Sequence, residues 1–111
     1  MGSDDHRVAL SIDIIEQSDA TATVALVGEL DMNSAPTPEQ VAEGLVDAGV
    51  TTLVIDCAGL TFMDSSGLRV LAGIHDRIEP DGGSILLRRP SRIVRQVITA
   101  TGLDTLIEID G

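Results

Sequence analysis

The order in which apolar periodicities follow one another along the 111-residue chain constrains its fold more than any other feature. Two segments with strand-like alternation or β-branched character, residues 8–14 and 21–27, come first and lie close enough to pair as a hairpin. Helix-like and strand-like segments then alternate to the end of the chain. The expected helices span residues 37–48, 65–79 and 91–101, and the expected strands that separate and follow them span 52–56, 84–88 and 106–109.

This β-β-α-β-α-β-α-β order predicts the fold class. Each strand–helix–strand crossover favours parallel pairing with a right-handed connection, whereas the opening hairpin is antiparallel. We therefore expect an α/β fold with a mixed five-stranded sheet and covering helices. The length is typical of one domain, so the prediction is a single domain over residues 1–111 with its core at about 8–109.

Composition limits the function classes. Phe62 is the one aromatic residue, so the core must be aliphatic and base stacking on rings is disfavoured. The net charge is −11, which repels nucleic acid and anionic membranes at long range. Every basic residue is arginine, and the cluster Arg88, Arg89, Arg92 and Arg95 is either a solvated face that balances nearby acids or a local docking patch.

Cys57 is the single cysteine, which excludes an internal disulfide and fits a reducing compartment. The polar N-terminus is not a signal peptide, and no apolar run is long enough to span a bilayer. We expect a cytoplasmic monomer that contacts neither membrane nor nucleic acid.

An enzyme is not predicted. Serine hydrolysis needs a base near the nucleophile, and only His6 and His75 are available. His75 follows Ser66 by nine residues on the expected helix, which is about 13 Å along its axis. No cluster of metal-ligand type, no phosphate-binding loop and no dinucleotide motif is present, so we expect no catalytic residue, no metal and no cofactor.

The segment from Phe62 to Leu68 is the most informative part of the chain. Asp64, Ser65 and Ser66 are three successive helix-capping residues, where one cap would suffice. Gly67 follows at a cost of about 1 kcal/mol in helix propensity. Two interpretations remain open, a redundantly capped helix with a tightly packed glycine or a helix start that another surface approaches closely. A serine at this position also suits phosphorylation, because a helix start tolerates negative charge.

Three segments resemble the STAS-domain family, and within it the bacterial anti-sigma-factor antagonists. They are Gly28-Glu29-Leu30-Asp31, Leu53-Val54-Ile55-Asp56 and Thr61-Phe62-Met63-Asp64-Ser65-Ser66-Gly67-Leu68. The last is the most specific, and the resemblance extends over residues 8–109 in the same element order. The family usually continues into a further helix after the last strand, so we expect that helix to be absent here.

The resemblance implies a regulator that switches partners. The unphosphorylated antagonist would bind an anti-sigma factor that is itself a GHKL-type serine kinase, phosphorylation of Ser66 would release it, and a phosphatase would reverse the change. ATP would belong to the kinase. Asp31 and Asp64 would flank the site, and Ser65 and Gly67 would complete the partner-binding face. The alternative is a STAS ligand-binding or scaffold module of a stress-signalling complex.

The sequence also predicts how exposed Phe62 and Asp64 are. Phe62 should be buried, because large apolar side chains usually pack inside, although an apolar contact with the partner is the alternative. Asp64 should be exposed, so that Asp64→Ala would change stability by under about 0.5 kcal/mol.

Overall fold

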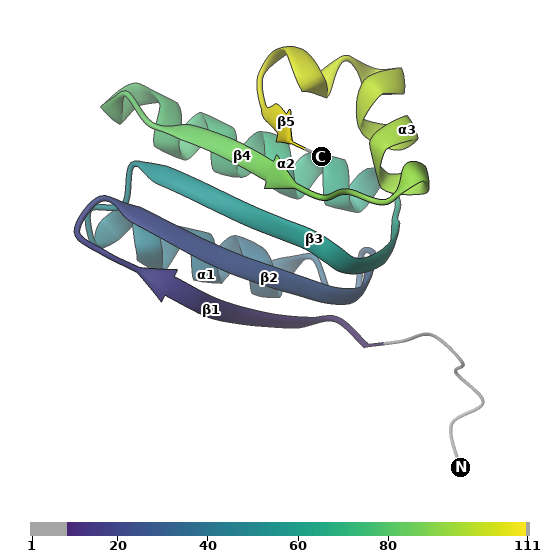
Figure 1. Ribbon diagram of the computed structural model, residues 1–111, viewed down its shortest axis with the longest axis horizontal. Helices are drawn as coiled ribbons and strands as arrows, with labels where there is room; N and C mark the ends of the chain where they lie inside the picture. The colour runs from purple at the N-terminus through teal and green to yellow at the C-terminus, as the bar shows by residue number, and fades with distance from the viewer. Residues whose placement is uncertain (1–8, 111) are drawn as a thin grey trace.

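A computed structural model describes residues 9–110, so Val8, the first residue of the expected core, lies outside the described part. Within these residues, an opening hairpin of two strands is followed by three helices that alternate with three further strands (Figure 1). The strands are β1 (Ser11–Gln17), β2 (Thr21–Leu30), β3 (Thr52–Met63), β4 (Ser84–Arg88) and β5 (Glu108–Asp110). The helices are α1 (Pro36–Asp47), α2 (Ser65–Ile78) and α3 (Arg92–Thr101), with short 3-10 turns at Glu79–Asp81 and Leu103–Thr105.

The strands lie in the sheet in sequence order, β1-β2-β3-β4-β5. β1 pairs with β2 antiparallel, and each later strand pairs parallel with its predecessor. Helices α1 and α2 lie behind the sheet in Figure 1, and α3 lies beyond the carboxyl end of β4. The predicted mixed five-stranded α/β fold is confirmed. Because β2, β3 and β4 are parallel, α1 and α2 both begin near the same edge of the sheet.

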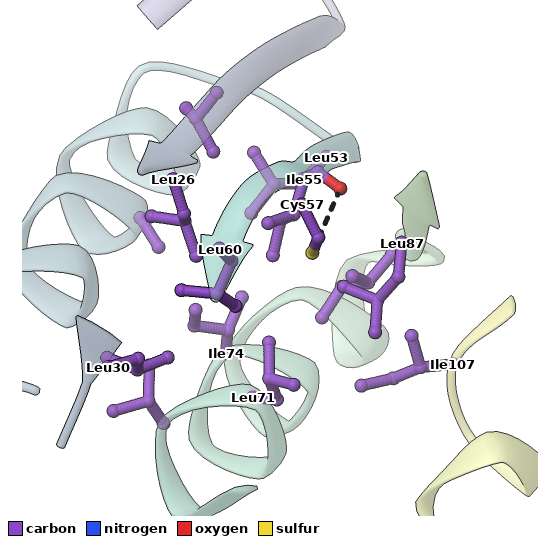
Figure 2. Packing of buried hydrophobic residues seen from close by; sticks show 14 of the residues in the cluster. Leu26, Leu30, Leu53, Ile55, Cys57, Leu60, Leu71, Ile74, Leu87 and Ile107 are labelled. Atoms are coloured by element: carbon purple, nitrogen blue, oxygen red, sulfur yellow. Dashed lines mark hydrogen bonds between the residues drawn. The ribbon is translucent and has the colours of Figure 1, made fainter. Parts of the chain in front are cut away.

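Alternate residues of the central strands form the core under the helices. Leu53, Ile55 and Cys57 of β3 point toward Leu71 and Ile74 of α2, and all five are buried (Figure 2). The thiol of Cys57 contacts the carbonyl oxygen of Ile55 at 3.7 Å. Burial raises the pKa of this thiol to about 12, so Cys57 remains a neutral core side chain.

The third strand is longer than the sequence predicts. The expected strand ended at Asp56, but β3 continues to Met63 because its second half pairs with the end of β2 after two register shifts. This extension decides the orientation of the next side chains. Met63 is buried at 2% exposure, whereas Phe62 is 41% exposed, so the expected burial of Phe62 is wrong.

The start of α1 also differs from expectation. The sequence predicted a helix from residue 37, but α1 begins at Pro36 after Ala35, which makes no side-chain capping bond. The preceding turn is instead closed by Asp31 and Ser34, whose side chains hydrogen-bond backbone groups of the same loop. Two prolines at Pro36 and Pro38 are compatible with this helix start because a first-turn amide needs no intrahelical acceptor.

Asp56 anchors the irregular part of β3. Its Oδ1 accepts a hydrogen bond from the Ala58 amide at 3.0 Å, and its Oδ2 accepts one from the Arg89 guanidinium. Asp56 is buried, with 8% of the residue exposed, whereas the Arg89 side chain is 60% exposed, so the guanidinium reaches the carboxylate from the solvent side. One arginine of the cluster therefore balances a nearby acid, as the first of the two sequence interpretations requires.

The Asp56 contacts predict a pH-dependent contribution to stability. The Ala58 amide and then Arg89 hold the pKa of Asp56 below its ordinary value of 3.8, against the opposing effect of burial. Because the folded-state pKa is the lower one, this stabilisation is present above the unfolded pKa and is lost as pH falls through the folded pKa. Asp56→Asn should therefore lower the free energy of unfolding by about 1 kcal/mol at pH 7. The difference from the parent should be smaller below about pH 4.

The measurement is urea unfolding of both proteins between neutral and acid pH. Asp104→Asn, at an exposed position, is the control and should shift stability by under about 0.5 kcal/mol. If the difference in free energy of unfolding between Asp56→Asn and the parent stays constant through the acid range, the Asp56 charge contributes nothing to stability.

Candidate functional site

The candidate site lies where β2 and β3 end at the same edge of the sheet. Leu30 and Met63 are the last paired residues of the two parallel strands. The amide of Asp64 donates to the carbonyl oxygen of Leu30 at 3.3 Å. Asp31 and Asp64 each follow one of these strand ends, and parallel strands lie about 4.8 Å apart. The structure thus places Asp31 and Asp64, the two acidic residues that the sequence assigned to the site, at neighbouring strand ends.

Asp64 is the N-cap of α2. Its Oδ1 accepts a hydrogen bond from the Ser66 amide at 2.8 Å, and its carbonyl oxygen accepts from the Gly67 amide at 3.0 Å. Ser65 and Ser66 are consequently the first two residues of the helix, as predicted. Asp64 is half-buried, so its predicted exposure is wrong. Because its side chain also caps α2, we now expect its removal to cost more than the sequence prediction allowed.

Asp31 organises the loop that faces the helix start. Its Oδ1 accepts hydrogen bonds from the amides of Asn33 at 3.0 Å and Ser34 at 3.2 Å. The Ser34 hydroxyl in turn donates to the carbonyl oxygen of Glu29 at 3.0 Å. The carboxylate of Asp31 therefore fixes the path of the chain from β2 into α1, and it does so beside the capped end of α2.

Packing inside the domain explains why residue 67 is glycine. It is buried, and a Cβ atom at this position would lie 2.2 Å from Cγ and 2.7 Å from Sδ of Met63. The same atom would lie 3.0 Å from a methyl carbon of Leu30. The missing side chain lets the first turn of α2 pack directly on the two strand ends. Of the two sequence interpretations, the tightly packed glycine explains this residue without a partner.

An open hollow adjoins Ser66. It has a volume of about 200 Å³ and is lined by residues of the β2–α1 loop, α1 and α2: Met32, Ala35, Pro36, Glu39, Ser66, Arg69 and Val70. Met32 is 70% exposed although it is apolar. Met32 and Arg69 were not predicted from the sequence, although an apolar residue in a largely polar turn was a signal for Met32.

The described residues offer no catalytic arrangement around either serine. His75 is on α2 at the distance from Ser66 that the sequence predicted, and its Nδ1 lies 3.6 Å from Oδ1 of its neighbour Asp76. His6 is outside the described part of the chain. Between residues 9 and 110, no three side chains of metal-ligand type are grouped for an ion, and no helix is long and apolar enough to cross a membrane.

The apolar hollow inside the core is too small for a small-molecule ligand. Its volume is about 10 Å³, and its walls are aliphatic side chains from β2, β3, α1 and α2. Binding pockets for drug-sized molecules are typically about 300–1,000 Å³. The open hollow beside Ser66 is larger, at about 200 Å³, and it adjoins the helix start.

Comparisons with known proteins identify relatives with this architecture. A family model for the STAS domain matches residues 12–110. The chain is 30% identical over 95 residues to the anti-sigma-B factor antagonist of Bacillus subtilis, covering 86% of each protein. It superimposes with a TM-score of 0.78 and 31% identity on an anti-sigma factor antagonist from Mycobacterium paratuberculosis, covering 90% of this chain and 86% of that one. The unphosphorylated form of the anti-sigma factor antagonist SpoIIAA gives a TM-score of 0.76 at 27% identity, covering 91% and 87%. Its phosphorylated form, from Bacillus, gives 0.70 at 26%, covering 91% and 90%.

Proposed function

Because this chain belongs to the STAS-domain family, we propose that it is an anti-sigma-factor antagonist whose unphosphorylated form binds an anti-sigma kinase and whose release follows phosphorylation of Ser66. The observation that carries the proposal is the position of Ser66, which is the second residue of α2 and borders an open hollow. The relative SpoIIAA has been solved with and without its phosphate, which supports a two-state mechanism for proteins of this kind.

In the proposed phosphoryl transfer, the antagonist supplies the acceptor serine and the kinase supplies the other reacting groups. The kinase would supply ATP, and the Ser66 hydroxyl oxygen would attack the γ-phosphorus, with ADP leaving and the hydroxyl proton passing to a base on the kinase. The antagonist would hold the acceptor serine in position. The Ser66 amide is fixed by Asp64, while the Ser66 hydroxyl makes no hydrogen bond to another described residue and is free to turn toward the hollow.

The proposed partner-binding face is the edge formed by Asp31, Asp64, Ser65 and Gly67. Asp31 and Asp64 shape the two backbone segments, Ser65 is exposed beside the acceptor serine, and Gly67 holds the helix start against the strand ends. Phe62 and Met32 add exposed apolar surface to the rim, and such side chains are enriched at protein interfaces. A phosphatase would restore the binding form, and the antagonist would act as a monomer without catalytic activity of its own.

The proposal is tested by capture of the partner and mapping of the modified residue. Immobilised Ser66→Ala should retain from a lysate of the source cells a protein with a histidine-kinase-like ATPase domain, and Ser66→Asp should not. The purified partner with ATP should then phosphorylate the parent on Ser66. Modification of Ser65, or equal capture by both variants, would overturn the assignment. Capture of a stress-signalling scaffold without a kinase would favour the alternative module.

The N-cap makes a separate prediction for Asp64. Asp64→Ala should lower the free energy of unfolding by about 1 kcal/mol, because the Ser66 amide loses its acceptor. It should also slow phosphorylation, since the acceptor serine is held by the same bond. Asp64→Asn is the matched control, because its side-chain oxygen can still cap the helix. Thermal unfolding and initial phosphorylation rates measure the two effects, and an Asp64→Ala protein as stable as the parent would contradict the capping role.

A further inference from the structure

Arg69 occupies a special position relative to the proposed phosphorylation site. It lies three residues after Ser66 on α2, and both side chains line the 200 Å³ hollow. Glu39, from α1, is the other charged residue of this lining. Among the described residues, Arg69 has no carboxylate partner within 4.0 Å, whereas Arg77 on the same helix lies 3.9 Å from Glu43 and 3.7 Å from Asp47.

Helix geometry directs Arg69 toward Ser66. Side chains three positions apart are neighbours on a helix, with about 5–6 Å between their Cβ atoms. Each helical side chain leans toward the N-terminus and covers the turn before its own Cα. The turn that Arg69 covers contains Ser66. A guanidinium group is also the side chain best suited to bind phosphate oxygens in pairs.

The helix start by itself offers a phosphate few donors. The amides of Ser66 and Gly67 already donate to the side chain and backbone of Asp64. The nearby side chains of Asp31, Asp64 and Glu39 are acidic, so they repel an added phosphate. A phosphoserine carries about −1.5 to −2 charges at pH 7, and Arg69 is the basic residue among the described residues that line the hollow.

We propose that Arg69 is the internal counter-ion of phosphorylated Ser66, an inference that rests on the proposed function. Before phosphorylation, Arg69 lines the hollow without a carboxylate partner among residues 9–110. After phosphorylation, it turns back over the first turn of α2 and binds the phosphate. The modification thus changes two features of the partner-binding face at once, because it adds an anion and withdraws a cation.

Phosphorus-31 NMR of protein with phosphoserine encoded at position 66 during synthesis tests this pairing without any kinase. A neighbouring cation favours the dianion of the phosphate and so lowers its second pKa. This pKa should therefore be higher by about 0.3–0.7 pH units in the Arg69→Gln protein than in the protein that retains Arg69. Arg77→Gln removes the same charge from the same helix about 16 Å from Ser66, and it should shift that pKa by about 0.1 unit or less.

The outcomes separate the two proposals. Equal titration of the Arg69→Gln and Arg77→Gln proteins would overturn the pairing. A shift confined to Arg69→Gln that shrinks at high salt is the expected result, because an exposed ion pair is screened. If a kinase modifies Ser65 instead, the proposed function fails while this measurement still reports on the pairing of residues 66 and 69.

Discussion

Ser66→Asp is expected to weaken binding to the partner kinase by more than about a hundredfold, whereas Ser66→Ala should bind as tightly as the parent and should not be released by ATP. The carboxylate at position 66 would lie beside Asp64 and close to Asp31, inside a face that the partner must cover. Placing a charge near like charges inside an interface typically costs several kcal/mol. A penalty of about 3 kcal/mol already corresponds to more than a hundredfold in the dissociation constant.

The same substitution should leave the fold intact. Position 66 is in the first turn of α2, where a negative charge interacts favourably with the helix dipole, and its side chain is not in the core. Ser66→Asp should therefore melt near the parent temperature. Ser65→Ala is the matched control because it changes the adjacent exposed serine, and it should still bind and still be phosphorylated.

Calorimetric titration of these variants against the kinase with ADP gives the affinities. Tight binding by Ser66→Asp would remove Ser66 from the switch. A large drop in its melting temperature would show that the loss of binding comes from unfolding instead of from charge at the interface.

Local patterns in the sequence were sufficient for most elements. α2 was predicted because its cap, its apolar spacing and its end are all coded within the helix, and β4 was predicted with the bounds that the structure has. β3 was truncated in the prediction because its second half has little alternation and is held by pairing with β2, a contact between segments about 30 residues apart. Burial of Phe62 was mispredicted for the same reason, since the length of β3 decides which neighbour faces the core.

The candidate site was predicted in part. Its serines and the two acidic residues follow from the capping pattern and the family resemblance, and the structure places all four at one edge. The capping bond of Asp64 and the hollow beside Ser66 depend on how α1 and α2 pack together, which no single segment encodes. Arg69 could not be assigned from sequence, because its proposed role depends on the hollow that it lines together with Ser66 and residues of α1.

Gly67→Ala should destabilise the domain by about 2 kcal/mol, although alanine is the better helix former. The added methyl group would lie 2.2 Å from Cγ and 2.7 Å from Sδ of Met63, closer than real Cβ atoms approach, and in a tight 3.0 Å contact with Leu30. Overpacking of this kind costs up to about 3 kcal/mol. The gain in helix propensity returns about 1 kcal/mol. For a domain of this size, the net loss lowers the melting temperature by about 8 °C.

Gly44→Ala is the matched control for that prediction. Gly44 is also within a helix, but a Cβ atom there would meet nothing within 4 Å. The substitution should therefore stabilise the domain by about 0.5–1 kcal/mol through helix propensity alone. Thermal unfolding of the two alanine variants should shift the melting temperature in opposite directions. If Gly67→Ala were as stable as Gly44→Ala yet failed to bind the kinase, Gly67 would be glycine because the partner needs access to its backbone, and the internal packing against Met63 would not be the reason.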